Sequence, residues 1–449
     1  MKKNVLKSVL GLAMASMMLT ACSNADEAPT KSTAPSTGDT AINFGAYMNR
    51  STTRGGATGE LTNAAALQAA GFGVLAYYTD NKPYAPDALP NFMYNQQVTY
   101  AGSAWTYSPL KYWPNEYGAD AASTGVDMLS FFAYAPYTPV KLVSGMVEAP
   151  NDQTGIIALT RATENGDPKV RYVASLDPDT KVDLCWANPI MNKIKTDYAS
   201  DGKVAFNFAH ALASINVQID ASDDGNPLDA NTRIYVRSVT FEGLALKGDL
   251  DLNKSTEILT PATTAKPLWY EPYINSSLVG EPVTIFDGRR DGREGVAEMP
   301  NETPIGFNAD IIQSGKYTIT PAFASTTPGV TNTPVNLFAA TEGADDATNL
   351  NMPIYVIPTD MPLRVTIAYD VETYDENLLS GFLSDGQAHG STIENVITKT
   401  VDLGGNALTL EAGKKYTIGL HLGMRSVKAD ATIAAWEPAA TPGEANLPE

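Results

Sequence analysis

Apolar and polar residues alternate with a period of two in many short runs along the chain, which is the pattern of β-strands that bury one face. In the run 363–371 the odd positions are apolar, and in 416–422 the even positions are. A short alanine-rich helix is expected at 61–70. The other runs are separated by glycine, proline, asparagine and aspartate, and they predict an all-β protein; they lie at 72–78, 129–134, 204–208, 215–219, 234–241, 354–357 and 427–435.

The first expected strand covers residues 42–48. Ile42, Phe44, Ala46 and Met48 occupy alternate positions, so they form one apolar face that we expect to point inward. The segment that follows, 50–56, is polar, ends in two glycines and contains two arginines. Such a segment is expected to be exposed and open to a trypsin-like protease.

The N-terminus has the organisation of a secretory signal. Three lysines within the first seven residues precede an apolar run at 9–19, which is too short to span a bilayer comfortably. Small residues at the end of this run lead into Cys22, as in the lipobox of bacterial lipoproteins, where the cysteine thiol is acylated. The alternative is an ordinary secreted protein whose cysteine lies near the cleavage site by chance.

Composition divides the chain further. A polar, proline-containing tether is expected before the first strand, and a threonine-rich stretch near 253–267 marks the best place for a domain boundary. The predicted segments are a signal peptide at 1–21, a tether at 22–41, the first strand and propeptide end at 42–54, β-sandwich domains at 55–258 and 259–436, and a tail at 437–449.

Charge and residue types exclude several classes of function. The formal net charge of −19 disfavours nucleic acid as a partner. Three histidines without paired-ligand spacing predict no metal site, and His210 is interpreted as a core residue. Cys185 lies in an apolar run, so packing is favoured over reactivity. No catalytic residue, cofactor or enzymatic activity is predicted.

Four aromatic residues, Trp105, Tyr107, Tyr112 and Trp113, lie close together around two prolines. Exposed aromatic rings of this kind stack on sugars, whereas aromatic residues at strand ends more often belong to a core. Both readings stay open. An uncleaved surface lipoprotein that binds glycans is therefore one function that the sequence allows.

The chain resembles the fimbrillins of Bacteroidales-type bacteria, which build type V pili. Each motif that carries this resemblance is weak alone, while their order and spacing together are specific. The motifs are the lipobox at Cys22, 42–44, Thr53-Arg54, 72–77, 105–107, 111–114, 129–136, 183–184, 204–213, 412–417 and a closing strand that ends at Trp436.

The resemblance implies two tandem transthyretin-like or immunoglobulin-like β-sandwich domains. It also implies export as an outer-membrane lipoprotein with palmitate on Cys22, surface delivery signalled by the acidic pair after that cysteine, and a mature form within a cell-surface fimbria. An arginine-specific, trypsin-like protease would cut between Arg54 and Gly55, with Arg50-Ser51 as second choice. The expected partners are other copies of the chain, other fimbrial subunits and a host or bacterial surface ligand that the fimbria adheres to.

Loss of the first strand would leave apolar side chains uncovered and backbone groups unpaired, so another subunit has to supply a replacement strand. The candidate donor is the last strand, whose alternate residues are Val427, Ala429, Ala431, Ile433 and Ala435. The alternative is that this strand simply completes its own domain. In that case the protein would be a tip or anchor subunit rather than a stalk pilin.

Overall fold

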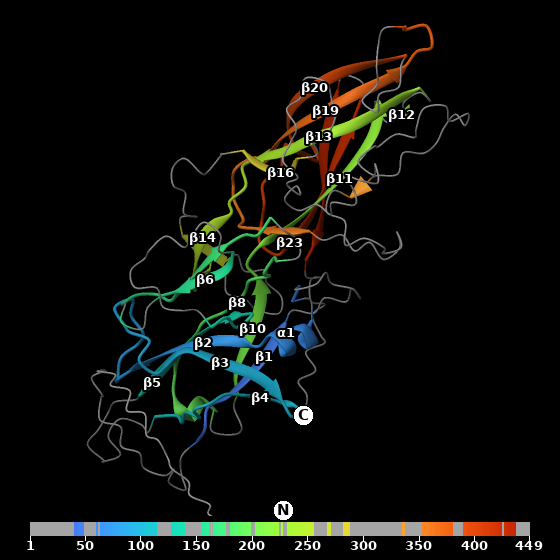
Figure 1. Ribbon diagram of the computed structural model, residues 1–449. Helices are drawn as coiled ribbons and strands as arrows, with labels where there is room; N and C mark the ends of the chain where they lie inside the picture. Colours follow the sequence, from blue (N-terminus) through green and yellow to red (C-terminus); the bar gives the residue numbers. More distant parts are fainter. Residues whose placement is uncertain are drawn as a thin grey trace, which may run out of the picture. The chain divides into compact units, whose positions relative to one another are not determined.

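The computed structural model confirms an all-β protein (Figure 1). All described residues belong to one compact unit, Thr40–Glu449. The structure describes residues 40–48, 60–61, 63–114, 127–139, 154–160, 163, 165–176, 180–198, 203–223, 226–227, 231–255, 267–270, 282–287, 335–336, 353–379, 389–423 and 426–436.

The first sheet is built from strands of the N-terminal half. Its order is β1 (Asn43–Met48), β10 (Lys203–His210), β8 (Cys185–Ala187), β5 (Met128–Ala135), β2 (Phe72–Thr79), β3 (Met93–Ala101) and β4 (Ala104–Thr106), with β9 (Ile190–Lys193) on β5. The first strand, β1, thus lies at one edge of this sheet. A second sheet has the order β15 (Pro267–Tyr270), β14 (Lys247–Ser255), β7 (Lys169–Val173) and β6 (Gly155–Leu159).

The central strands of the first sheet, β2 and β5, are buried on both faces, and β2 shows how the alternation assigns its residues. Leu75 and Tyr77 point to one face, where they pack with residues of β7 and β14 from the second sheet. Phe72 and Val74 point to the other face, into a core that they share with β1, β10 and α1. Because every residue of β2 from Phe72 to Tyr77 is buried, its run is continuously apolar, as expected for a strand covered on both faces.

The remaining strands form two sheets that enclose a separate aliphatic core. One sheet has the order β12 (Asn226–Pro227), β11 (Ala213–Asp223), β23 (Lys414–Leu422), β24 (Val427–Ala435), β21 (Asp402–Leu403) and β22 (Asn406–Ala407), with β17 (Val335–Asn336) and β18 (Ile354–Val356) on β11. The other has the order β16 (Val283–Asp287), β13 (Thr232–Glu242), β19 (Arg364–Tyr374) and β20 (Gly390–Thr400). Figure 1 shows the two layers.

The helix α1 (Ala64–Ala70) begins three residues later than the alanine-rich stretch 61–70 predicted. The cause is Asn63, whose side-chain oxygen accepts a hydrogen bond from the backbone N–H of Ala66 and caps the first turn. The helix ends at Gly71, which has a φ of 66° and bonds back to Leu67. A 3-10 turn, η1 (Lys195–Tyr198), is the other helical element of the described chain.

Strand pairing crosses the predicted division at 258/259. The strands β11 and β13 precede that division, yet they pair with β23 and β19 from the C-terminal part. The strand β15 follows that division, yet it pairs with β14, which in turn pairs with β7 of the N-terminal part. The two-domain division stays a prediction. Among the described residues, no helix is both long and apolar enough to cross a membrane.

Candidate functional site

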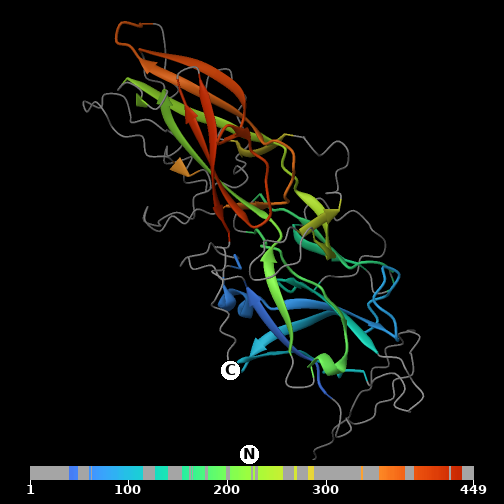
Figure 2. The ribbon, with the colours of Figure 1, turned by 180° about the vertical axis from the view of Figure 1, so that it is seen from behind.

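The strand β1 is paired along its whole length on one side. It runs parallel to β10, with Asn43 opposite Lys203 and Met48 opposite Phe208 (Figures 1 and 2). The neighbour β8 contacts β10 from Phe208 onward. Within the described sheet, residues 203–207 of β10 therefore have β1 as their ladder partner.

The start of β1 is also held from its other side. The backbone N–H of Ile42 donates to the carbonyl of Lys111 at 2.9 Å, and that of Trp113 donates to the carbonyl of Thr40 at 2.9 Å. Between them, Ala41 and Tyr112 form an antiparallel bridge. The strand thus enters a slot between β10 and the segment 111–113.

The side chains of β1 alternate between the core and the surface. Ile42, Phe44 and Met48 are 0%, 2% and 7% exposed, whereas Tyr47 is 42% exposed. Ala46, the fourth member of the apolar face, is partly buried and packs against the same core. Three large side chains and one small one therefore fill the slot.

Phe44 is the centre of an aromatic cluster. Its ring lies 5.2 Å from that of Tyr107 and 5.9 Å from that of Phe206, on which it stacks. The rings of Phe72 and Phe131 meet it edge-on at 6.3 and 6.1 Å. The rings of Phe206, Phe72 and Phe131 come from β10, β2 and β5, and the ring of Tyr107 comes from the chain between β4 and residue 111. The pocket that they form therefore exists only in the folded sheet.

The aromatic segment singled out as a possible glycan contact lies against this site. The hydroxyl of Tyr107 donates to the carbonyl of Ile42 at 2.9 Å, and burial raises the pKa of this tyrosine. Trp113 is 3% exposed and packs on Phe131, while Trp105 packs on Phe72. Tyr112 is partly buried. The geometry places these rings as part of the wall around β1, and a glycan contact stays a prediction.

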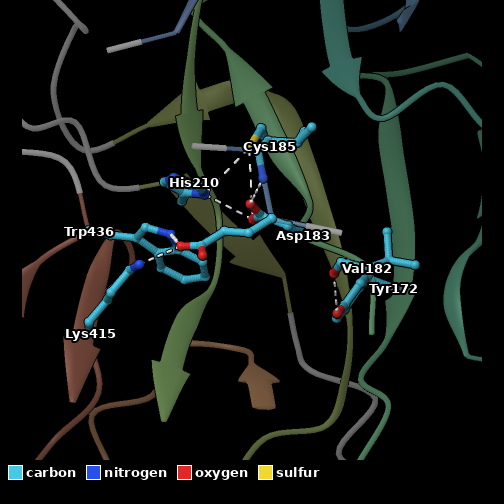
Figure 3. A network of polar contacts seen from close by, with 9 residues as sticks. Tyr172, Val182, Asp183, Cys185, His210, Lys415 and Trp436 are labelled. Atoms are coloured by element: carbon cyan, nitrogen blue, oxygen red, sulfur yellow. Dashed lines mark hydrogen bonds and ion pairs between the residues drawn. The ribbon is translucent and has the colours of Figure 1, made fainter. Parts of the chain in front are cut away.

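Residues 60 and 61 are the first described residues after β1, and a polar network fixes them (Figure 3). The N–H of Leu61 donates to Asp183 Oδ2 at 2.8 Å. The other oxygen of this carboxylate lies 2.9 Å from His210 Nδ1. Asp183 and His210 are 0% and 2% exposed, so the pair is shielded from water and from salt.

Glu60 extends the network to the C-terminal end of the described chain. Its carboxylate accepts a hydrogen bond from Trp436 Nε1 at 2.6 Å and pairs with Lys415 Nζ at 2.5 Å (Figure 3). The indole of Trp436 in turn stacks on the imidazole of His210, with ring centroids 4.1 Å apart. The network therefore joins residues 60–61 to β10, to β23 and to the residue that follows β24.

The three side chains Asp183, Cys185 and His210 present metal-ligating atoms within 4.8 Å of one another, all buried. The hydrogen bonds already described occupy both oxygens of Asp183, and the thiol of Cys185 lies 3.6 Å from His210 Nδ1. The same imidazole nitrogen faces both the thiol and the carboxylate. A nucleophilic Cys-His-Asp relay needs opposite nitrogens, so this arrangement is a packing network and not a catalytic triad.

Sequence reasoning missed Glu60, Lys415 and the partner of His210. Only one signal was available for the last of these: Asp183 is a lone acid inside the apolar run 182–186. A buried acid of this kind requires a partner, but the sequence does not say which residue supplies it. His210 itself is a buried residue with a hydrogen-bond partner, as its interpretation as a core histidine anticipated.

The candidate donor strand β24 lies within a sheet. It pairs antiparallel with β23 along its length, from Lys414 opposite Ala435 to Leu422 opposite Val427. Val427 and Ala429 are buried, Ala431 is partly buried, and Ile433 is 43% exposed. A donor role for β24 stays a prediction.

Several predicted residues lie outside the part of the chain that the structure describes. They are the lipidation site Cys22, the preferred cleavage site at Arg54 and Gly55, and the second choice at Arg50 and Ser51.

Comparison with known proteins agrees with this architecture. A family model described as fimbrillin-like matches residues 53–275. The curated fimbrium subunit Fim1C of Phocaeicola vulgatus is 26% identical over 380 residues, which are 82% of this chain and 82% of that protein.

Among solved structures, a fimbrial protein from Bacteroides vulgatus ATCC 8482 is similar, with a TM-score of 0.50 and 20% identity over 88% of this chain and 99% of that one. This structural similarity supports the fold. The family match and the curated relative show that the chain belongs to the fimbrillin-like family and is a fimbrial subunit of the Bacteroidales type.

Proposed function

We propose that this chain is a structural pilin that is exported as a lipoprotein, cut after its first strand and polymerised by donor-strand exchange into an adhesive cell-surface fimbria. Its mechanism is assembly, without catalysis. The observation that carries the proposal is the position of β1, an edge strand with a buried apolar face that comes just before the arginines of the 50–56 segment.

Removal of β1 would leave an empty slot that favours the binding of a replacement strand. The backbone of β10 between residues 203 and 207 would lose its ladder partner within the described sheet, and the pocket around Phe44 would open. Unpaired edges and exposed apolar surface both favour pairing with another chain. Burial of Ile42, Phe44 and Met48 stabilises by about 1.5–3 kcal/mol each before entropy is counted.

The polar network makes such a cleavage compatible with an intact fold. Glu60 and Leu61 are held by Trp436, Lys415 and Asp183, none of which belongs to β1. A chain that begins at Gly55 would keep these contacts. Loss of residues 1–54 would therefore empty the slot without releasing the new N-terminal segment.

The donor strand has two possible sources. One is β24 of another copy, which would make this chain a stalk pilin. The other is a strand of a different fimbrial subunit. In that case this chain would be a tip or anchor subunit, or one of several subunits in a mixed fimbria. The choice depends on the fit between donor and slot.

Cys22 supplies the membrane attachment in this proposal. Palmitate on Cys22 would hold the precursor at the outer membrane while β1 occupies its slot, and cleavage after Arg54 would remove the anchor and the strand together. The protease is a trypsin-like, arginine-specific enzyme. The surface ligand of the finished fimbria is a separate question.

Treatment of purified full-length precursor with a trypsin-like protease tests the proposal. We expect a new N-terminus at Gly55, loss of the segment 1–54, and binding of an added peptide of residues 41–49 to the emptied slot. Arg54→Ala should block all three, and Arg50→Ala is the matched control that should leave them unchanged. Peptide binding by uncut Arg54→Ala protein equal to that of the cut native chain would contradict the proposal, as would a cut chain that has lost β1 and binds no peptide.

A further inference from the structure

We propose that the slot of β1 selects its donor by an aromatic side chain at the position of Phe44, and that the donor is a strand of a different subunit rather than β24 of another copy. The inference rests on the proposed strand exchange. The required donor has the order large apolar, aromatic, small, large apolar at alternate positions, as in Ile42, Phe44, Ala46 and Met48.

The aromatic requirement comes from the pocket. Phe44 is 2% exposed, and its ring contacts the rings of Phe72, Tyr107, Phe131 and Phe206 at 5.2–6.3 Å between centroids. Four rings around one position leave a volume that an aliphatic or small side chain does not fill. Cores tolerate such a loss of volume poorly, because the surrounding groups relax only in part.

The pocket walls are themselves fixed. Phe72 packs on Trp105 at 4.9 Å and on Phe208 at 5.4 Å, so its ring is held by neighbours other than Phe44. Tyr107 is tied by its hydroxyl, which hydrogen-bonds to the backbone of Lys111. Walls held in this way cannot readily collapse onto a smaller donor residue.

The strand β24 does not match this slot in any register. Its alternate residues give the orders Val-Ala-Ala-Ile or Ala-Ala-Ile-Ala in one direction and Ile-Ala-Ala-Val or Ala-Ile-Ala-Ala in the other. Three of these orders place alanine in the pocket of Phe44. The fourth places Ile433 there but leaves alanine at the positions of both Ile42 and Met48.

The strand β24 is also held in its own sheet. It is paired with β23 from end to end, and the residue that follows it, Trp436, is 2% exposed and bound to Glu60. A donor role would require the loss of these contacts. Both the mismatch and this retention indicate a donor from elsewhere.

The first experiment tests the slot in the intact chain, without any cleavage. The triple variant Ile42→Val/Phe44→Ala/Met48→Ile gives β1 the Val-Ala-Ala-Ile order of β24, and Ile42→Val/Met48→Ile is the matched control that keeps the aromatic residue. We expect the unfolding equilibrium constant of the triple variant to exceed that of the control by about 100-fold or more. A difference below about fivefold would overturn the inference, and a triple variant that fails to fold beside a folded control supports it.

The second experiment tests the donor in trans with the cleaved protein. Labelled peptides are added after proteolysis: residues 41–49, the same peptide with Phe44→Ala, and residues 426–436 of β24. We expect the first to bind about 100-fold or more tightly than either of the others. Equal binding of the β24 peptide would overturn the inference. If proteolysis releases no β1 and no peptide binds, the proposed strand exchange fails, while the in-chain variants still decide whether the slot needs an aromatic residue.

Discussion

Replacement of Asp183 by asparagine removes the charge at the centre of the polar network while keeping the shape of the side chain. In the native chain one carboxylate oxygen accepts the N–H of Leu61 at 2.8 Å and the other lies 2.9 Å from His210 Nδ1. An asparagine side chain has a single acceptor oxygen, so it cannot accept from both the Leu61 N–H and a protonated His210 Nδ1. Its NH2 group then faces either a backbone donor or the imidazole.

The size of the effect follows from burial. Asp183 is fully buried, and a hydrogen bond to a charged group contributes about 1.5–3 kcal/mol net. One such bond is lost in Asp183→Asn, so the free energy of unfolding is expected to fall by about 1.5–3 kcal/mol. Because the Leu61 N–H loses its charged acceptor in either orientation of the asparagine, the local opening of residues 60–61 should become easier by a similar amount.

Amide hydrogen exchange measures that local opening directly. The Leu61 N–H should exchange roughly 10- to 150-fold faster in Asp183→Asn than in the native chain, which is the same free energy expressed as a rate ratio. Urea unfolding followed by tryptophan fluorescence gives the global value, since Trp436 stacks on His210 within the network. Asp87→Asn, at an exposed position, is the matched control and should change neither quantity.

The reasoning would be refuted by an exchange rate at Leu61 within about twofold of the native value, together with an unchanged urea midpoint. Such a result would mean that other contacts hold residues 60–61. The proposal that the mature chain keeps its start after cleavage would then lose its structural basis.

Three further outcomes are expected. Phe44→Ala should lower the free energy of unfolding of the intact chain by about 3–5 kcal/mol. Tyr47→Ala, on the exposed face of the same strand, should change it by less than about 0.5 kcal/mol. Similar urea midpoints for the two variants would contradict the assignment of Phe44 to a tightly packed pocket. Trp436→Phe keeps a ring on His210 but removes the donor to Glu60, so a loss of about 1–3 kcal/mol is expected, and no change in the urea midpoint would show that the bond is dispensable. Burial raises the pKa of Asp251 above its ordinary value, so the folded state binds the carboxyl proton more tightly than the unfolded state, and the stability this contributes is lost as pH rises through the folded pKa. The Tm of Asp251→Asn, measured relative to that of the native chain, should therefore increase between pH 3 and 7. A decrease of this relative Tm over the same range would reverse the assigned sign.

The strands and their inward faces were predictable because a period of two is a local property. The runs at 363–371 and 416–422 correspond to β19 and β23, whose alternate residues are buried as the sequence pattern indicates. The same holds for β1, in which Ile42, Phe44 and Met48 are buried and Tyr47 is exposed. Backbone geometry forces this alternation, so no knowledge of the partner strand is needed.

Strand partners were not predictable from the same pattern. An alternating strand pairs equally well with many neighbours, and the actual pairing of β11 with β23 joins residues about 200 positions apart in the chain. The polar network shows the same limit, because Glu60 and Trp436 meet across 376 positions. Contacts of this kind depend on how the sheets stack, which a local pattern does not encode.

The sequence by itself determined that the chain is an all-β protein with an apolar first strand followed by an arginine-containing segment, because alternation, turn residues and charge are read position by position. Only the tertiary structure decided that four rings enclose Phe44 and that the aromatic segment around Tyr107 and Trp113 packs against the first strand. It also decided that residues 60–61 are hydrogen-bonded to Asp183 and Trp436. The physical reason is that a pocket is formed by side chains from several strands at once. Its size and its walls exist only after those strands have been brought together.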